Sequence, residues 1–180
     1  MELTDTRLID AAPAVVWAAL LDADVLKEAV PGCESLTGTV ADGYEAVVVQ
    51  KVGPVKARFS GVVTFSDVIE GQSLTLTGEG KGGAAGFAKG SAHVTLTPEG
   101  TGTSLSYQVE AKVGGKLAQL GSRIIDGFAR KMADDFFERF ADAVEGPKDD
   151  APETDTETDA DSGDEGGKSK GWFKKLWGGD

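Results

Sequence analysis

Residues 117–140 read LAQLGSRIIDGFARKMADDFFERF and carry the longest helical pattern in the chain. Large apolar side chains recur there every three or four residues, with charged side chains between them. The apolar positions are Leu117, Leu120, Ile124, Phe128, Met132, Phe136 and Phe140. Gly114 and Gly115 mark the start of the predicted helix. A helix of about eight turns must bury such a stripe against a broad apolar surface.

The residues before this helix supply that surface, because they alternate apolar and polar side chains. Glycine-bearing breaks divide them into six predicted strands joined by short turns, which favours an antiparallel meander. The predicted strands span residues 34–41, 44–52, 55–69, 72–81, 86–97 and 103–113.

A further strand is predicted at residues 2–9, and two short helices follow it. Pro13 opens the first helix, and Asp22 or Asp24 caps the second, which ends before Pro31 and Gly32. The complete order predicts an α+β helix-grip fold. In this fold a curved antiparallel seven-stranded sheet wraps around the long C-terminal helix, with two short helices after the first strand.

The composition of the 180 residues limits the class of partner. Thirty acidic against eighteen basic side chains give a formal net charge of −12, which argues against nucleic acid as a partner. The N-terminus lacks the pattern of an export signal, and no apolar run reaches the roughly 18 residues of a spanning helix. The single cysteine, Cys33, fits a reducing compartment. We therefore expect a soluble, cytoplasmic protein.

The charge distribution divides the chain into three parts. Residues 1–144 form the predicted helix-grip, ligand-binding domain. Residues 145–167 hold ten acidic side chains, one basic side chain and no large apolar side chain, so we expect a disordered acidic linker. Residues 168–180 combine lysines with large apolar side chains and are predicted to form an amphipathic membrane-docking segment.

The pattern of this last segment is typical of the bilayer interface, where tryptophan and lysine are both favoured. A groove on a protein partner, or docking on the chain's own domain, are the alternatives. The predicted membrane-binding residues are Trp172, Phe173, Lys174, Lys175, Leu176 and Trp177.

A curved sheet that wraps around one helix can leave an apolar cavity between them, and glycines such as Gly61, Gly78 and Gly80 favour such a space. Ordinary core packing is the alternative interpretation of the same side chains. The predicted cavity residues are Phe59, Val63, Phe65, Phe87, Leu105, Tyr107, Val109, Leu120, Ile124 and Phe128.

Few residues suit catalysis or metal binding. His93 is the only histidine and lies on the polar face of its strand, which excludes a familiar zinc site. Cys33 has no neighbouring base in the sequence, so a small buried thiol is the better interpretation. We therefore predict no catalytic residue and no bound metal.

Four blocks of sequence carry a specific resemblance. They read LLDADVLKEAVPGCESL at 20–36, KVGPVKA at 51–57, GFAKG at 86–90 and VGGKLAQLG at 113–121. In this order they resemble the carbon monoxide dehydrogenase G-subunit family, within the polyketide cyclase and START-like helix-grip superfamily. The resemblance covers about residues 2–144.

The resemblance implies a non-catalytic accessory protein. Such a protein would recruit a molybdenum-containing carbon monoxide dehydrogenase, or a related molybdenum hydroxylase, to the inner leaflet of the cytoplasmic membrane. It would attach peripherally through its C-terminus and carry a quinone, either menaquinone or ubiquinone, in its cavity. The alternatives are a pure membrane anchor, a binder of another lipid, or a cyclase-like enzyme of the same fold.

Overall fold

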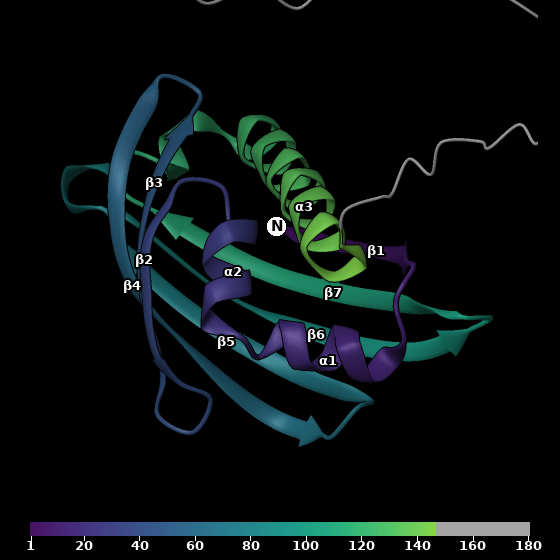
Figure 1. Ribbon diagram of the computed structural model, residues 1–180. Coiled ribbons are helices and arrows are strands. Elements are labelled where there is room, and N and C mark those ends of the chain that lie inside the picture. The colour runs from purple at the N-terminus through teal and green to yellow at the C-terminus, as the bar shows by residue number, and fades with distance from the viewer. Residues whose placement is uncertain (147–180) are drawn as a thin grey trace, which may run out of the picture. The chain divides into compact units, whose positions relative to one another are not determined.

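The computed structural model describes residues 1–146 (Figure 1). The predicted membrane-docking segment at 168–180 lies outside the described residues, as does all but the first two residues of the predicted linker. The elements are β1 (Glu2–Ile9), α1 (Pro13–Leu20), α2 (Ala23–Ala29), β2 (Cys33–Thr39), β3 (Gly43–Val52), β4 (Val55–Ile69), β5 (Ser73–Lys81), η1 (Gly83–Ala85), β6 (Phe87–Glu99), β7 (Gly102–Gly114), η2 (Ala118–Leu120) and α3 (Ser122–Glu145).

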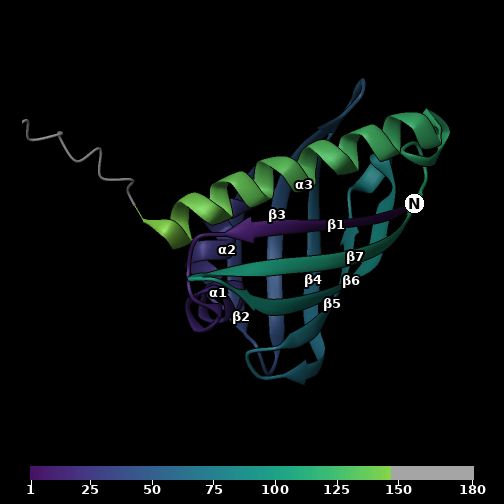
Figure 2. The same ribbon diagram turned by 90° about the vertical axis from the view of Figure 1, so that its right-hand side faces the viewer.

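The seven strands form one antiparallel sheet in the order β1-β7-β6-β5-β4-β3-β2. Strands β2 to β7 follow one another as a meander. Strand β1 pairs with β7 and is the edge strand opposite β2. Figure 2 shows the sheet curving around α3, which lies across its open side. The predicted helix-grip architecture, including the two short helices after the first strand, is confirmed.

Local sequence explains the two short helices. Pro13 is the first residue of α1, where its missing N–H needs no partner. Asp22 caps α2, because its carboxylate accepts hydrogen bonds from the backbone N–H groups of Asp24 at 2.8 Å and Val25 at 3.2 Å. The helix ends at Ala29, two residues before Pro31, as predicted.

The long helix begins later than the sequence pattern predicts. The residues after Gly115 form the short 3₁₀ helix η2, and α3 starts only at Ser122. Gly121 separates the two with a φ of +86°, a left-handed conformation that an α-helix does not contain. At the other end α3 includes Glu145, the first residue of the predicted linker, and the Glu145 carboxylate accepts a hydrogen bond from the Asp10 N–H at 3.0 Å.

The apolar core consists of two separate clusters. The first cluster packs α1 and the C-terminal half of α3 on the sheet, around fully buried Leu105 and Phe140. The second cluster lies at the other end of α3, around Val52, Leu117 and Ile125. Sheet and helix are therefore held together at two places along α3.

Candidate functional site

Small side chains occupy the inner face of the sheet between the two clusters. Two rows of directly paired residues cross the central strands there. One row is Ala46, Gly61, Gly80 and Ala88, and the other is Val63, Gly78, Gly90 and Ala111. We call these eight residues the inner band. It combines glycine, alanine and one valine. At Gly78 and Gly80 there is room for a Cβ, whereas at Gly61 and Gly90 a backbone carbonyl of the neighbouring strand lies too close for one.

The inner band is partly exposed although α3 lies across the open side of the sheet (Figure 2). None of its eight residues is buried, and none belongs to either core cluster. On α3, Met132 is also partly exposed and lies between Phe128, which packs on the second cluster, and Phe136, which packs on the first. Part of this exposure lies on the outer side of the sheet, where Gly61 borders one surface hollow and Gly78 borders another. The inner side of the band offers small apolar residues that an apolar ligand could cover.

The predicted cavity residues are divided between the inner band, the two core clusters and the surface. Val63 belongs to the band itself. The first cluster holds Phe65, Leu105, Tyr107 and Val109, and the second holds Phe59, Leu120 and Phe128. Leu105 has no exposed surface, so it acts as core.

Two of the predicted cavity residues point elsewhere. Phe87 is 40% exposed and lies on the outer face with Lys89, because the inner positions of β6 are Ala88, Gly90 and Ala92. Ile124 is 42% exposed, and its neighbour Ile125 is the one that packs in the second cluster. Ile124 lies in the first turn of α3 and faces the β3–β4 turn, where a Cβ at Gly53 would stand 3.4 Å from its Cγ2.

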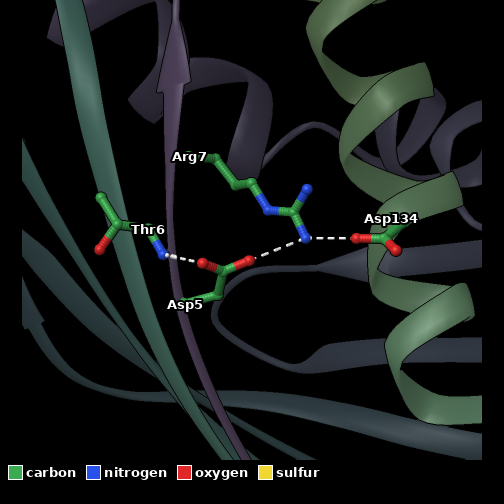
Figure 3. Close-up of polar contacts among 4 residues, drawn as sticks. All are labelled: Asp5, Thr6, Arg7 and Asp134. Atoms are coloured by element: carbon green, nitrogen blue, oxygen red, sulfur yellow. Dashed lines mark hydrogen bonds and ion pairs between the residues drawn. The ribbon is translucent and has the colours of Figure 1, made fainter. Parts of the chain in front are cut away.

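An arginine on the inner side of β1 was not identified from the sequence. The Arg7 Nη2 donates to Asp134 Oδ1 of α3 at 2.5 Å and lies 2.9 Å from Asp5 Oδ2 (Figure 3). Its guanidinium carbon stands 5.5 Å from the centre of the Phe137 ring. Asp134 is the main cause of a raised pKa for Arg7, which therefore stays charged. The alternation of Leu3, Arg7 and Ile9 along β1 was the available signal for this inward position.

Tyr107 completes this polar edge of the site. Its ring is 5% exposed and stacks on Phe137 at 4.9 Å. Its hydroxyl lies beside the Arg7 guanidinium and helps to raise the pKa of Arg7, although the hydroxyl and the buried Arg7 Nε have no partner with good hydrogen-bond geometry among the described residues. A pocket of about 280 Å³ between β1 and α3 is lined by both residues, with Leu3 and Arg130 among its other walls. Because the Tyr107 oxygen can accept from the neighbouring Arg7, the Tyr107 O–H is the donor left for a ligand that brings an oxygen acceptor.

The unpaired hydroxyl gives a testable expectation. Tyr107→Phe is expected to raise the free energy of unfolding by about 1 kcal/mol, because it removes a buried polar group that has no partner among the described residues. Tyr44→Phe is the matched control, since the Tyr44 hydroxyl donates to the Leu21 carbonyl at 2.5 Å. That variant should lose about 1 kcal/mol. Urea unfolding of both variants measures the difference, and equal losses would contradict the assignment of Tyr107 as unpaired.

The residues considered for catalysis are poorly placed for it. His93 is exposed, with its Nδ1 3.1 Å from Thr75 Oγ1. Burial raises the pKa of the Cys33 thiol, which disfavours the nucleophilic thiolate. Within residues 1–146, no group of three histidine, cysteine, aspartate or glutamate side chains is arranged to hold a metal ion. None of the helices in the described part combines the length and apolar character needed to cross a bilayer.

Comparison with known proteins gives a family match. Residues 6–145 match the family model described as the G subunit of carbon monoxide dehydrogenase, or CoxG. No curated protein matches the chain.

Solved structures share the fold. A conserved protein from Geobacillus kaustophilus is 27% identical, with a TM-score of 0.75 over 81% of this chain and 95% of its own. A START superfamily protein from Mycobacterium smegmatis is 12% identical, with a TM-score of 0.60 over 80% of this chain and 97% of its own. A protein from Thermus thermophilus is 17% identical, with a TM-score of 0.60 over 80% and 97%. The last two show likeness of fold alone.

Proposed function

Because the chain belongs to the CoxG family of carbon monoxide dehydrogenase, we propose that it is an accessory protein that carries a quinone between a membrane and its client enzyme. The client would be a molybdenum-containing carbon monoxide dehydrogenase or a related molybdenum hydroxylase. The family name associates the chain with carbon monoxide dehydrogenase as an accessory subunit. The chain would add no catalytic group of its own.

The observation that carries the quinone proposal is the partly exposed inner band between the two core clusters. A quinone with an isoprenoid tail exposes a large apolar area to water, and covering that area against alanine, glycine and valine is favourable. The ring also carries carbonyl oxygens, and Tyr107 offers a donor in the separate pocket between β1 and α3. Menaquinone and ubiquinone both fit this description.

Recruitment to the inner leaflet of the cytoplasmic membrane would use residues 168–180. Burial of Trp172, Phe173, Leu176 and Trp177 would release on the order of 6–10 kcal/mol before the cost of ordering is subtracted. Lys174 and Lys175 would add attraction to anionic lipid. The expected result is reversible, peripheral attachment.

The experiment that tests the carrier proposal is mass spectrometry of lipids gently extracted from the native full-length protein. We expect a quinone in the extract, and the same host without the protein gives the background. A phospholipid or fatty acid in place of the quinone would identify a binder of another lipid. An extract without bound lipid or quinone would contradict the carrier proposal and favour a membrane anchor that carries no ligand.

The docking segment has its own test in the full chain. Replacing Trp172, Phe173, Leu176 and Trp177 by serine is expected to lower co-sedimentation with vesicles at least about tenfold, because it removes the apolar contribution to binding. The melting temperature should stay unchanged. The matched control replaces four exposed apolar residues of the described domain by serine, namely Leu8, Val15, Val68 and Ile69. A large fall in melting temperature for the first variant would mean that the segment packs on the domain.

A further inference from the structure

Three chain connections meet at the end of the sheet where α3 begins. They are the β3–β4 turn, the β5–β6 connection that contains η1, and the β7–α3 connection that contains η2 (Figure 2). The Leu117 N–H donates to the Ala85 carbonyl at 3.0 Å, which joins the second connection to the third. Val52, Leu117 and Ile125 share one cluster, which joins the first to the third. The three connections therefore form one continuous surface.

This surface is basic in an acidic protein. The ranges 51–58, 80–91 and 111–125 contain eight basic side chains and no acidic one. The remainder of residues 1–146 holds five basic and twenty acidic side chains. The eight, which we call the basic end, are Lys51, Lys56, Arg58, Lys81, Lys89, Lys112, Lys116 and Arg123.

These charges are exposed and mostly unpaired. All eight residues are exposed, and within the described part of the chain only Arg58 among them forms an ion pair, with Glu34 at 2.8 Å. Glu79 is opposite Lys89 in the sheet but forms no ion pair with it. Glu79 and Glu110 also border this surface beside Lys89 and Lys112, so the lysines outnumber the nearby acidic residues without being ion-paired to them.

The sheet register places like charges directly opposite each other at this end. Lys51 pairs with Lys56 between β3 and β4, and Lys89 pairs with Lys112 between β6 and β7. Like charges in directly opposed positions destabilise a sheet. A bound anionic surface would relieve both repulsions, so the arrangement favours an anionic partner.

Apolar side chains accompany the charges. Phe87 is 40% exposed and Ile124 is 42% exposed. Phe87 lines a surface hollow of about 460 Å³ together with Lys81, Lys89 and Glu79. Exposed aromatic and aliphatic groups between lysines are the combination found where proteins enter the headgroup layer of a bilayer.

We propose that the basic end docks the folded domain on an anionic lipid surface, with lipid phosphates as the partners of its lysines. This inference rests on the proposed membrane recruitment and adds a second contact, separate from residues 168–180. It also orients the domain, because Lys89 and Phe87 lie on the outer face of the sheet and that face would then be turned toward the bilayer at the end where α3 begins.

The test uses the full chain and co-sedimentation with phosphatidylcholine vesicles, with and without phosphatidylglycerol. The variant Lys81→Gln/Lys89→Gln/Lys112→Gln is expected to bind vesicles with phosphatidylglycerol about a hundredfold more weakly, since each basic residue contributes roughly a fivefold factor. The matched control is Lys27→Gln/Lys131→Gln/Arg139→Gln, which removes the same charge from exposed positions elsewhere. It should bind nearly as wild type, and added salt should weaken wild-type binding.

The outcomes separate this inference from the proposed function. If the basic-end variant binds vesicles as well as wild type does, while the four-serine variant of residues 168–180 binds weakly, the basic end is not a lipid-binding surface and the proposed function stands. Absence of wild-type binding to either vesicle would also contradict the proposed membrane recruitment. If vesicle binding is unchanged but the basic-end variant loses affinity for a peptide of residues 149–165, the chain's own acidic segment is the partner and the lipid assignment is overturned.

Thermal melting of each variant checks folding. Removing the repulsion between Lys89 and Lys112 should keep the basic-end variant at least as stable as wild type.

Discussion

Replacing Gly78 by leucine is expected to reduce the ligand that co-purifies with the protein about tenfold, without loss of stability. A Cβ at Gly78 would stand 3.7 Å from Val63 Cγ2 and 3.8 Å from the Val62 carbonyl oxygen, which are ordinary contacts. The rest of the leucine would extend over the inner band and occupy the space assigned to the ligand. Mass spectrometry of extracted lipid measures the loss, and urea unfolding measures the stability.

The same substitution at Gly127 is the matched control. Gly127 is an exposed residue of α3, and a Cβ there would meet nothing within 4 Å. Gly127→Leu should keep the ligand and gain up to about 1 kcal/mol from helix propensity. If Gly78→Leu instead unfolds the domain, the inner band is already covered by side chains and the carrier proposal loses its support.

Gly61→Ala is expected to lower the free energy of unfolding by about 2–3 kcal/mol. A Cβ at Gly61 would lie 2.3 Å from the backbone carbonyl oxygen of Glu79 in β5, and a backbone atom cannot move aside without shifting the strand. Gly80, its direct partner in the sheet, provides the control. A Cβ there would be 3.8 Å from the nearest atom, Phe59 Cβ.

Gly80→Ala should therefore leave the free energy of unfolding unchanged or raise it by about 0.5 kcal/mol, because alanine lowers the conformational entropy of the unfolded chain. Urea unfolding of the two variants gives the comparison. Equal effects would contradict the steric conflict expected between a Cβ at Gly61 and the Glu79 carbonyl oxygen.

The inner band and the basic end suggest how a protein of this family could perform the proposed function. An accessory protein that carries an insoluble ligand needs an apolar interior and a way to meet the bilayer. The inner band is a candidate for the first, and the basic end together with residues 168–180 is a candidate for the second. The two can be tested separately, because no residue of the inner band belongs to the basic end.

Much of the fold was predictable from residue patterns. Alternating side chains and glycine-bearing turns indicated the six strands of the meander nearly to the residue, and Pro13 and Asp22 indicated the starts of α1 and α2. The beginning of α3 was misplaced because side-chain period does not reveal that Gly121 adopts a left-handed conformation. The first turn of α3 packs through Ile125, while Ile124 is 42% exposed.

The site was less predictable, because its members come from distant parts of the chain. Arg7 and Asp134 are 127 residues apart, and nothing in either local pattern indicates their contact. Phe87 was assigned to the interior by its apolar character, whereas the register of β6 places it outside. The basic end could not be predicted from the sequence either, because its eight basic residues are spread over three separate segments of the chain.

The sequence by itself determined the helix-grip class, the number and order of elements and the family, because hydrophobic period, turn residues and short motifs are local properties. Only the tertiary structure decided that the core is split in two around an inner band, that Arg7 and Tyr107 meet in a pocket beside α3, and that eight basic side chains gather at one end. Those features depend on strand register and on the curvature of the sheet, which long-range packing sets.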